Sequence, residues 1–389
     1  MPLSKVALYC LESSSFFRQD ILNSREGVHE VNKERYKYGE FCDLYKEYRK
    51  YPDKFYEYTR ISVETFDYIL QHIEVHLQHH IKSKRVVTNS EKLFLTLRYL
   101  GHGISFKSLS HSYRLGRSTV AKTIYQTLKA IWKGLSQLHM PQPSQEDFKK
   151  ISEDIFSKWQ FPNCIGSING KHFRVMKPSL RGSEYYNYKK YFSLVLQAIS
   201  DADYKFVAIE VGGKGRQSDG GTFHFSILNK LLTNNRFNVP PPRKLPGSNV
   251  ILPHVLVGDE AYPLKTYLMR PYPSGNLDSE KENFNKRLSR ARVTIKCAFG
   301  ILTNKWRIFM KVIETNTTHA KLIIKVACLL HNIVRQKDGN NDKDFREIMI
   351  NLSNSNNTKI TRSRRNNRAT LRAIAIRDQY RNYFVNNPI

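Results

Sequence analysis

The chain has 389 residues, with 63 Lys or Arg against 34 Asp or Glu, which gives a formal net charge of +29. This length predicts two or three domains, and a hydrophobic content of 40% excludes a wholly disordered chain. No run approaches the roughly 18 apolar residues that a membrane span needs. The five scattered cysteines lack metal-ligand or redox spacing, so we expect a soluble intracellular protein. The excess of basic over acidic residues predicts a polyanionic partner, most commonly nucleic acid.

The N-terminal part of the sequence is polar and Tyr-rich at first and then follows a helical period. We predict a polar, helical segment over residues 1–55 and a helical module over residues 56–150. Within the module, Ser62 is placed to cap one helix, and a second helix is expected over residues 90–100.

A short helix, a glycine turn and a longer helix are predicted between residues 106 and 131. The longer helix buries an apolar stripe and leaves polar and basic residues outward near its N-terminus, namely Arg117, Ser118, Thr119 and Lys122. This layout is typical of a helix-turn-helix, whose second helix enters the major groove of DNA. We predict that these four residues contact bases or phosphates. The alternative is a helical hairpin with a purely structural role.

Runs typical of strands begin after about residue 155. They cover residues 164–168, 193–199, 206–211 and 255–257, and helical stretches cover 222–232, 281–302 and 320–336. The order β-β-β-α-β-α-α predicts an α/β domain over residues 151–340, with a mixed sheet flanked by helices.

The remaining residues, 341–389, are expected to form a basic tail. Residues 351–389 contain eight Lys or Arg against one acid. We expect a flexible linker first and then a short helix over residues 371–384. The cluster from Arg362 to Arg368 is interpreted as a nuclear-import signal or a nonspecific DNA tether, with a solvated linker as the alternative.

Several motifs follow one another in the α/β segment: CIGSINGKHFRV from Cys164, GRQSDGGTF, VGDEAYPLKTYLMRPYP, AFGILTNKWRIF and CLLHNIVR. Their order along the chain and their residues resemble those of the PIF/Harbinger transposases and their domesticated relatives. The resemblance implies an RNase H-like DDE nuclease domain, a hydrolase in which two Asp and one Glu bind two Mg²⁺ or Mn²⁺ ions at a DNA phosphate. It also implies a Myb-like DNA-binding partner protein and a nuclear location with a cytoplasmic pool. A homo-oligomer is left open.

The positions that match the family's catalytic triad are Asn169, Asp259 and Lys296, so two of the three carboxylates are replaced. Asp259 and Lys296 are separated by 36 residues, as the family arrangement expects. No Asp or Glu occurs from residue 283 to 313, so no neighbouring acid takes over on that helix. The three positions sum to zero charge, and an ammonium repels a divalent cation. We therefore predict weak or lost metal binding and a catalytically inactive protein.

Two other acids are considered as replacement ligands. Asp219 lies in a motif typical of the family and is a candidate metal ligand, although a turn or helix cap is the favoured interpretation. Glu260 follows Asp259 directly and is expected to point elsewhere. An active nuclease or transposase with a rebuilt site is therefore one alternative function, and a nuclear protein-interaction scaffold is another.

Three further patterns are interpreted with their alternatives. The cations Lys189 and Lys190 alternate with tyrosines, which suits stacking on bases and binding of phosphates as well as an ordinary strand entry. Lys214 and Arg216 lie in a glycine-rich stretch that is a candidate phosphate contact, with a mobile connection as the favoured alternative. Four histidines, His72, His76, His79 and His80, are interpreted as an exposed polar face, with zinc binding as the minor alternative.

Overall fold

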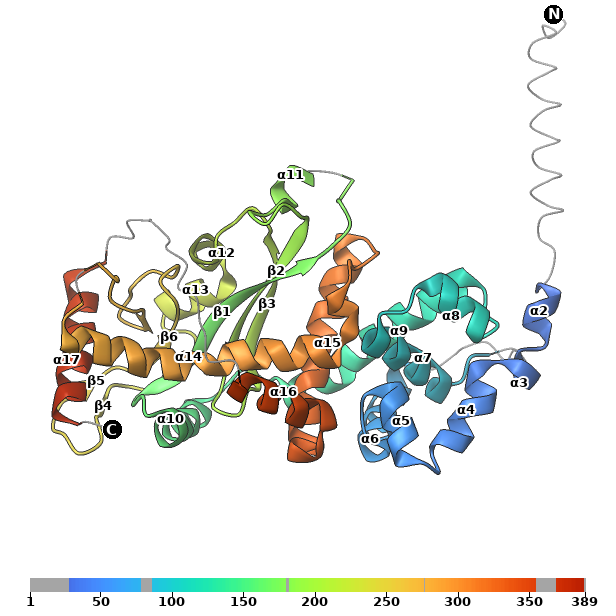
Figure 1. The fold of residues 1–389 in the computed structure, drawn as a ribbon, viewed down its shortest axis with the longest axis horizontal. Helices are drawn as coiled ribbons and strands as arrows, with labels where there is room; N and C mark the ends of the chain where they lie inside the picture. Colours follow the sequence, from blue (N-terminus) through green and yellow to red (C-terminus); the bar gives the residue numbers. More distant parts are fainter. Residues whose placement is uncertain (1–27, 78–85, 180–181, 276, 355–368, 388–389) are drawn as a thin grey trace, which may run out of the picture.

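The computed structural model describes residues 28–77, 86–179, 182–275, 277–354 and 369–387. The protein is elongated, with a helical region at one end and a sheet-containing region at the other (Figure 1). None of the helices in these ranges is long and apolar enough to cross a membrane.

The helical region packs around a core of aromatic side chains. Its elements are α2 (Glu30–Lys33), α3 (Arg35–Tyr38), α4 (Glu40–Tyr48), α5 (Pro52–Thr59), α6 (Val63–Ile73), η1 (Glu74–His76), α7 (Asn89–His102), α8 (Phe106–Ser112) and α9 (Arg117–His139). The side chain of Ser62 caps α6, as the sequence predicts, by accepting a hydrogen bond from the Thr65 amide. Phe55, Phe66 and Phe94 are fully buried and lie within ring-contact distance of one another.

A five-stranded mixed sheet forms the centre of the second region, in the order β3-β2-β1-β6-β7. Its strands are β1 (Cys164–Arg174), β2 (Ser193–Ser200), β3 (Phe206–Lys214), β6 (Val255–Val257) and β7 (Leu268–Met269). The first three strands pair antiparallel, whereas β6 runs parallel to β1 and to β7. A separate pair, β4 (Arg243–Lys244) with β5 (Ile251–Leu252), lies outside this sheet.

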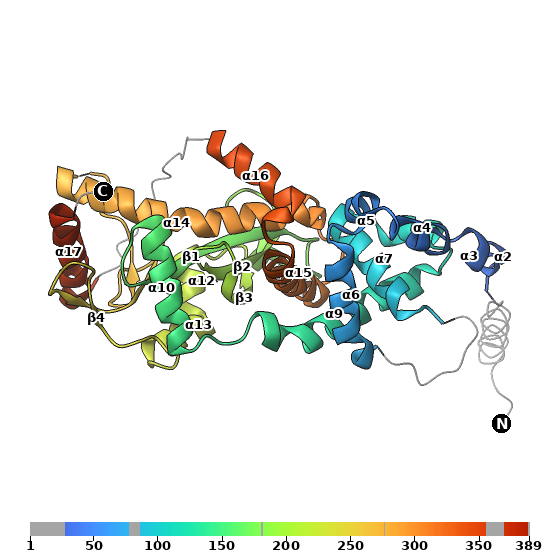
Figure 2. The ribbon, with the colours of Figure 1, turned by 90° about the horizontal axis from the view of Figure 1, so that it is seen from below.

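Helices cover both faces of the sheet, as Figure 2 shows. The helices of this region are α10 (Gln145–Trp159), α11 (Gly182–Tyr185), α12 (Asp219–Phe225), α13 (Ile227–Thr233), α14 (Ser279–Lys305), η2 (Arg307–Met310), α15 (Thr317–Lys337), η3 (Gly339–Asn341), α16 (Lys343–Asn354) and α17 (Leu371–Asn386). On β1, the Ser167 side chain donates a hydrogen bond to the Ala291 carbonyl of α14, while Ile168 packs with α10 and α12. Successive residues of β1 thus face opposite helical layers.

This architecture confirms the expected α/β, RNase H-like sheet flanked by helices and preceded by an all-helical region. One helix was expected over residues 222–232, but two are present, because Ser226 ends α12 and caps α13 through the Asn229 amide. The boundaries expected at residues 55 and 150 fall inside α5 and α10. One continuous hydrophobic core includes residues of both regions.

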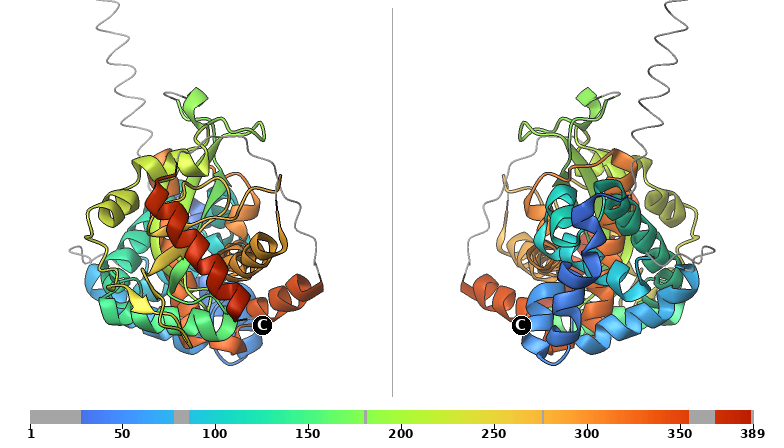
Figure 3. Two further views of the ribbon diagram at one scale, coloured as in Figure 1. Left: turned by 90° about the vertical axis from the view of Figure 1, so that its left-hand side faces the viewer. Right: turned by 90° about the vertical axis from the view of Figure 1, so that its right-hand side faces the viewer.

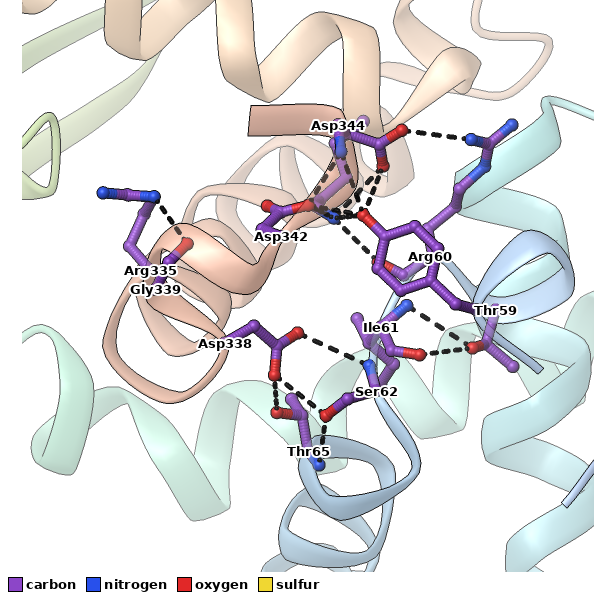
Figure 4. A network of polar contacts seen from close by, with 12 residues as sticks. Thr59, Arg60, Ile61, Ser62, Thr65, Arg335, Asp338, Gly339, Asp342 and Asp344 are labelled. Atoms are coloured by element: carbon purple, nitrogen blue, oxygen red, sulfur yellow. Dashed lines mark hydrogen bonds and ion pairs between the residues drawn. The ribbon is translucent and has the colours of Figure 1, made fainter. Parts of the chain in front are cut away.

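Buried polar contacts also join the two regions, and Figure 4 shows them from close by. The Asp338 carboxylate at the end of α15 accepts hydrogen bonds from the Ser62 and Thr65 hydroxyls at the start of α6. The Arg60 guanidinium forms an ion pair with Asp344 of α16 at 3.2 Å. Lys305, the last residue of α14, forms ion pairs with Asp342 at 2.9 Å and with Asp344 at 3.2 Å. The end of α14 is therefore fixed against the helical region by charge as well as by packing.

The expected basic tail is largely folded where it is described. Instead of a linker directly after residue 341, α16 packs against α14. Helix α17 crosses the end of the molecule that is remote from the helical region (Figure 3). Its Tyr380 and Phe384 are fully buried and pack around Phe161. The Arg362–Arg368 cluster lies outside the described residues.

Candidate functional site: a charged cluster at the strand ends

Asn169 of β1 and Asp259, just past the end of β6, follow a pair of aligned residues on neighbouring parallel strands. Ser167 of β1 pairs with Val257 of β6, and each functional residue follows two positions later. By alternation with Ser167, Asn169 faces α14. The Asn169 side-chain oxygen accepts a hydrogen bond from the Gly170 amide at 2.8 Å, and one Asp259 carboxylate oxygen accepts from the Ala261 amide at 3.0 Å.

Helix α14 presents two cations to this pair. Lys296, the third triad position, is exposed, and Arg292 lies one helical turn earlier and is only partly exposed. Partial burial and the neighbouring Arg292 lower the pKa of Lys296, and the Asp259 carboxylate opposes that shift. Burial also lowers the pKa of Arg292, and the carboxylates of Asp259 and Glu260 oppose it. Both cations therefore lie within the electrostatic reach of Asp259.

Asp219 reaches the same cluster from the α12 side. It is the first residue of α12, and the helix cap is Ser218, whose hydroxyl accepts a hydrogen bond from the Gly221 amide. The favoured interpretation of Asp219 as a cap is therefore wrong. A Cβ atom placed on Gly170 would lie 2.2 Å from an Asp219 carboxylate oxygen. Only glycine at position 170 leaves room for this carboxylate against β1.

Burial, and then the nearby Asp259 carboxylate, raise the pKa of Asp219 to about 6. The ordinary value of 3.8 applies in the unfolded chain, so the folded state binds the proton more tightly. The free energy of unfolding should therefore fall as the pH rises from about 4 to about 6.

Asp219→Asn should remove this pH dependence. A shift of about 2 pKa units corresponds to at most about 3 kcal/mol, so the variant should be more stable than the natural protein at pH 7 by up to this amount. The free energies of unfolding of the two proteins should become equal below pH 4. Urea unfolding at several pH values measures the difference, and a difference independent of pH between 4 and 7 would contradict the assignment.

The residues at the triad positions do not fit a pair of divalent metal ions. DDE superfamily endonucleases generally use such metals, which prefer several carboxylate oxygens. Here the three positions offer one amide, one carboxylate and one ammonium. Even with Asp219 and Glu260 nearby, the described part of the chain contains no group of three or more His, Cys, Asp or Glu side chains able to hold a metal ion.

The helix-turn-helix candidates lie together on the surface of the helical region. Arg117, Ser118, Thr119 and Lys122 are all exposed on the first two turns of α9. Gly116 begins the helix without a side-chain cap, and its first turn contains no acid. The N-terminus of α9 therefore combines exposed amides with basic side chains.

The other basic candidates lie on the long β1–β2 connection and on β3. Lys189 and Lys190 are exposed, and the adjacent Tyr188 is 79% exposed. Residues 212–214 belong to β3 and not to a connection, and residues 215 and 216 form the turn that follows it. The Lys214 side chain forms an ion pair with Glu184 at 2.6 Å, whereas Arg216 is exposed.

The histidine pattern is not a metal centre within the described residues. His72 hydrogen-bonds the Tyr68 carbonyl one turn earlier on α6, and His76 lies in η1. His79 and His80 lie outside the described residues.

Parts of this chain are similar in sequence to known proteins. Residues 168–332 match the family model described as DDE superfamily endonuclease. The Arabidopsis thaliana protein named "Protein ALP1-like" is 28% identical over 298 residues, which cover 73% of this chain and 71% of that protein. No solved structure matches the chain.

The sheet order, the strand-end positions and the family match together define a DDE-type endonuclease-like domain. The matched segment, residues 168–332, lies within the part of the chain that carries the PIF/Harbinger motifs. The motif resemblance that begins at Cys164 is thereby confirmed.

Proposed function

We propose that this protein binds DNA and has lost the strand cleavage of its transposase ancestors. The observation that carries the proposal is Lys296, a cation near Asp259 at the position where the family resemblance implies a carboxylate, with Arg292 as a second cation one helical turn earlier. A metal ion beside Asp259 would share that carboxylate with two fixed positive charges. Their repulsion is strongest where water is partly excluded, as at the partly buried Arg292.

Support for DNA binding comes from charge and from the surface of α9. The net charge of +29 favours a polyanion. The N-terminus of α9 presents Arg117 and Lys122 beside exposed amides, which suits a DNA phosphate or a base edge. The exposed Lys189, Lys190 and Arg216 offer further phosphate contacts in the sheet-containing region.

Alanine at Arg117 and Lys122 should weaken DNA binding. Each phosphate contact that is lost should reduce the slope of log K against log salt by about 1. Both side chains are exposed and form no ion pair with any residue that the structure describes, so the variants should keep their stability. Fluorescence anisotropy with a labelled duplex at several KCl concentrations measures the slope. Affinity and slope equal to those of the natural protein in both variants would contradict this assignment.

An active nuclease with a rebuilt site is the second candidate, and the position of Asp219 favours it. Two carboxylates, Asp219 and Asp259, interact at the strand ends, and Glu260 lies close enough to act on Arg292. If this set binds Mn²⁺, isothermal titration calorimetry will show binding that disappears in Asp219→Asn. No heat of binding from the natural protein would exclude this candidate.

A further inference from the structure

A small cavity in the helical region lies between η1, α7 and α9 and is strongly basic. Its volume is about 240 Å³, and its lining includes His76, Lys92, Gln126, Lys129 and Lys133. None of the lining residues that the structure describes is acidic. Glu74 belongs to the same short helix as His76 but does not line the cavity.

The exposed face of α9 leads directly to this cavity. The exposed residues Lys122, Gln126, Lys129 and Lys133 recur at steps of four, three and four positions, so they form one stripe along the helix. The sequence of α9 contains no Asp or Glu. Neither Lys129 nor Lys133 forms an ion pair within the described ranges. Their charges are therefore available to an external anion.

The cavity is built by close packing, not by loose surface side chains. A Cβ atom on Gly134 would lie 2.7 Å from the His72 carbonyl oxygen and 3.2 Å from the His76 ring. Glycine therefore lets the end of α6 and the following η1 lie directly against α9. Lys92 of α7 is 2% exposed, and its ammonium donates hydrogen bonds of 3.2 Å to the Leu77 carbonyl and the Asn89 side chain.

We propose that this cavity binds a phosphate group, held by Lys129 and Lys133 at its rim with Lys92 and His76 behind them. The phosphate belongs to the backbone of a DNA duplex that lies along α9, a statement that rests on the proposed function. Lys122 and Lys133 are 11 residues apart, or roughly 16 Å along a helix, so one duplex can contact both. A soluble polyphosphate offers the same chemistry as an alternative source.

The burial of Lys92 supports an anion at this place. Burial lowers the pKa of Lys92, because partial removal from water disfavours the charged ammonium. A bound phosphate would offset that effect. Lysine binds phosphate as a compact point charge, so it does not need the planar geometry that arginine requires.

The test compares the natural protein with Lys129→Ala/Lys133→Ala and with the control Lys230→Ala/Lys244→Ala. Both double variants remove two exposed lysines, and the control pair lies on α13 and β4. Anisotropy with a labelled DNA duplex is measured over a range of KCl concentrations. We expect the slope of log K against log salt to fall by about 1 in the cavity variant only. Pyrophosphate should raise the Tm of the natural protein and the control, and not that of the cavity variant.

The two measurements separate this proposal from DNA binding itself. If the natural protein does not bind DNA but pyrophosphate stabilises it only when Lys129 and Lys133 are present, the proposed function fails. The cavity is then a site for a soluble polyphosphate. If both double variants match the natural protein in salt slope and in the pyrophosphate response, the phosphate site is overturned, whether or not DNA binds.

Discussion

Lys305→Met should destabilise the protein by about 3–5 kcal/mol, the range for breaking a buried ion pair by removing one partner. The side chains of Lys305 and Asp342 are 1% and 0% exposed. The Lys305 ammonium also donates to the Tyr56 hydroxyl at 3.0 Å and to the Arg60 carbonyl at 2.8 Å. Methionine fills a similar volume but removes the ammonium that pairs with the buried Asp342 carboxylate. Urea unfolding measures the loss.

Lys158→Met is the matched control for that experiment. Lys158 forms an ion pair with Asp203, and the side chains are 46% and 51% exposed. An exposed pair contributes only about 0–1 kcal/mol, because water and salt screen it. A loss of less than 1 kcal/mol from Lys305→Met, equal to that of the control, would show that the network does not hold α14 against α5.

Asn169→Asp combined with Lys296→Glu should create a metal site that the natural protein lacks. The two changes convert the summed formal charge of the three triad positions from 0 to −3. They also remove the ammonium near Asp259. Mn²⁺ at 100 times the dissociation constant should then stabilise the double variant by about 2.7 kcal/mol. The Tm of the natural protein should not change with Mn²⁺. Differential scanning calorimetry with and without Mn²⁺ measures both.

Lys296→Gln alone serves as the control for this revertant. It removes the positive charge but adds no carboxylate, so metal binding should remain weak. Equal Mn²⁺ stabilisation of the natural protein, Lys296→Gln and the double variant would mean that other residues bind the metal. Asp219→Asn in the double variant would then show whether Asp219 is among them.

Much of the fold could be predicted from local patterns in the sequence. The apolar stripes predicted α6, α7 and α9, and the strand-type runs predicted the strands of the sheet, because each of these signals lies within one continuous segment. The short helix expected over residues 371–384 is present as α17. Helix α16 was missed, because it is held by packing against α14, a contact between residues far apart in sequence that no local pattern reports.

The candidate site was predicted only in part, and for similar reasons. The family resemblance implied that Asn169 and Asp259 belong to one site, whereas the strand pairing that aligns them is seen only in the structure. The approach of Asp219 depends on the absence of a side chain at Gly170, which becomes visible only in three dimensions. Arg292 was also missed, although its position one turn before Lys296 on a predicted helix is a signal that sequence reasoning can use.

The most direct test of the central claim is nicking of supercoiled plasmid in Mg²⁺ and in Mn²⁺. The natural protein should retard the plasmid on a gel but leave it supercoiled. The revertant Asn169→Asp/Lys296→Glu is run beside it and should nick the plasmid. Nicking by the natural protein that is abolished in Asp259→Ala would contradict the account, because it would show that this chain still cleaves DNA through a site that includes Asp259.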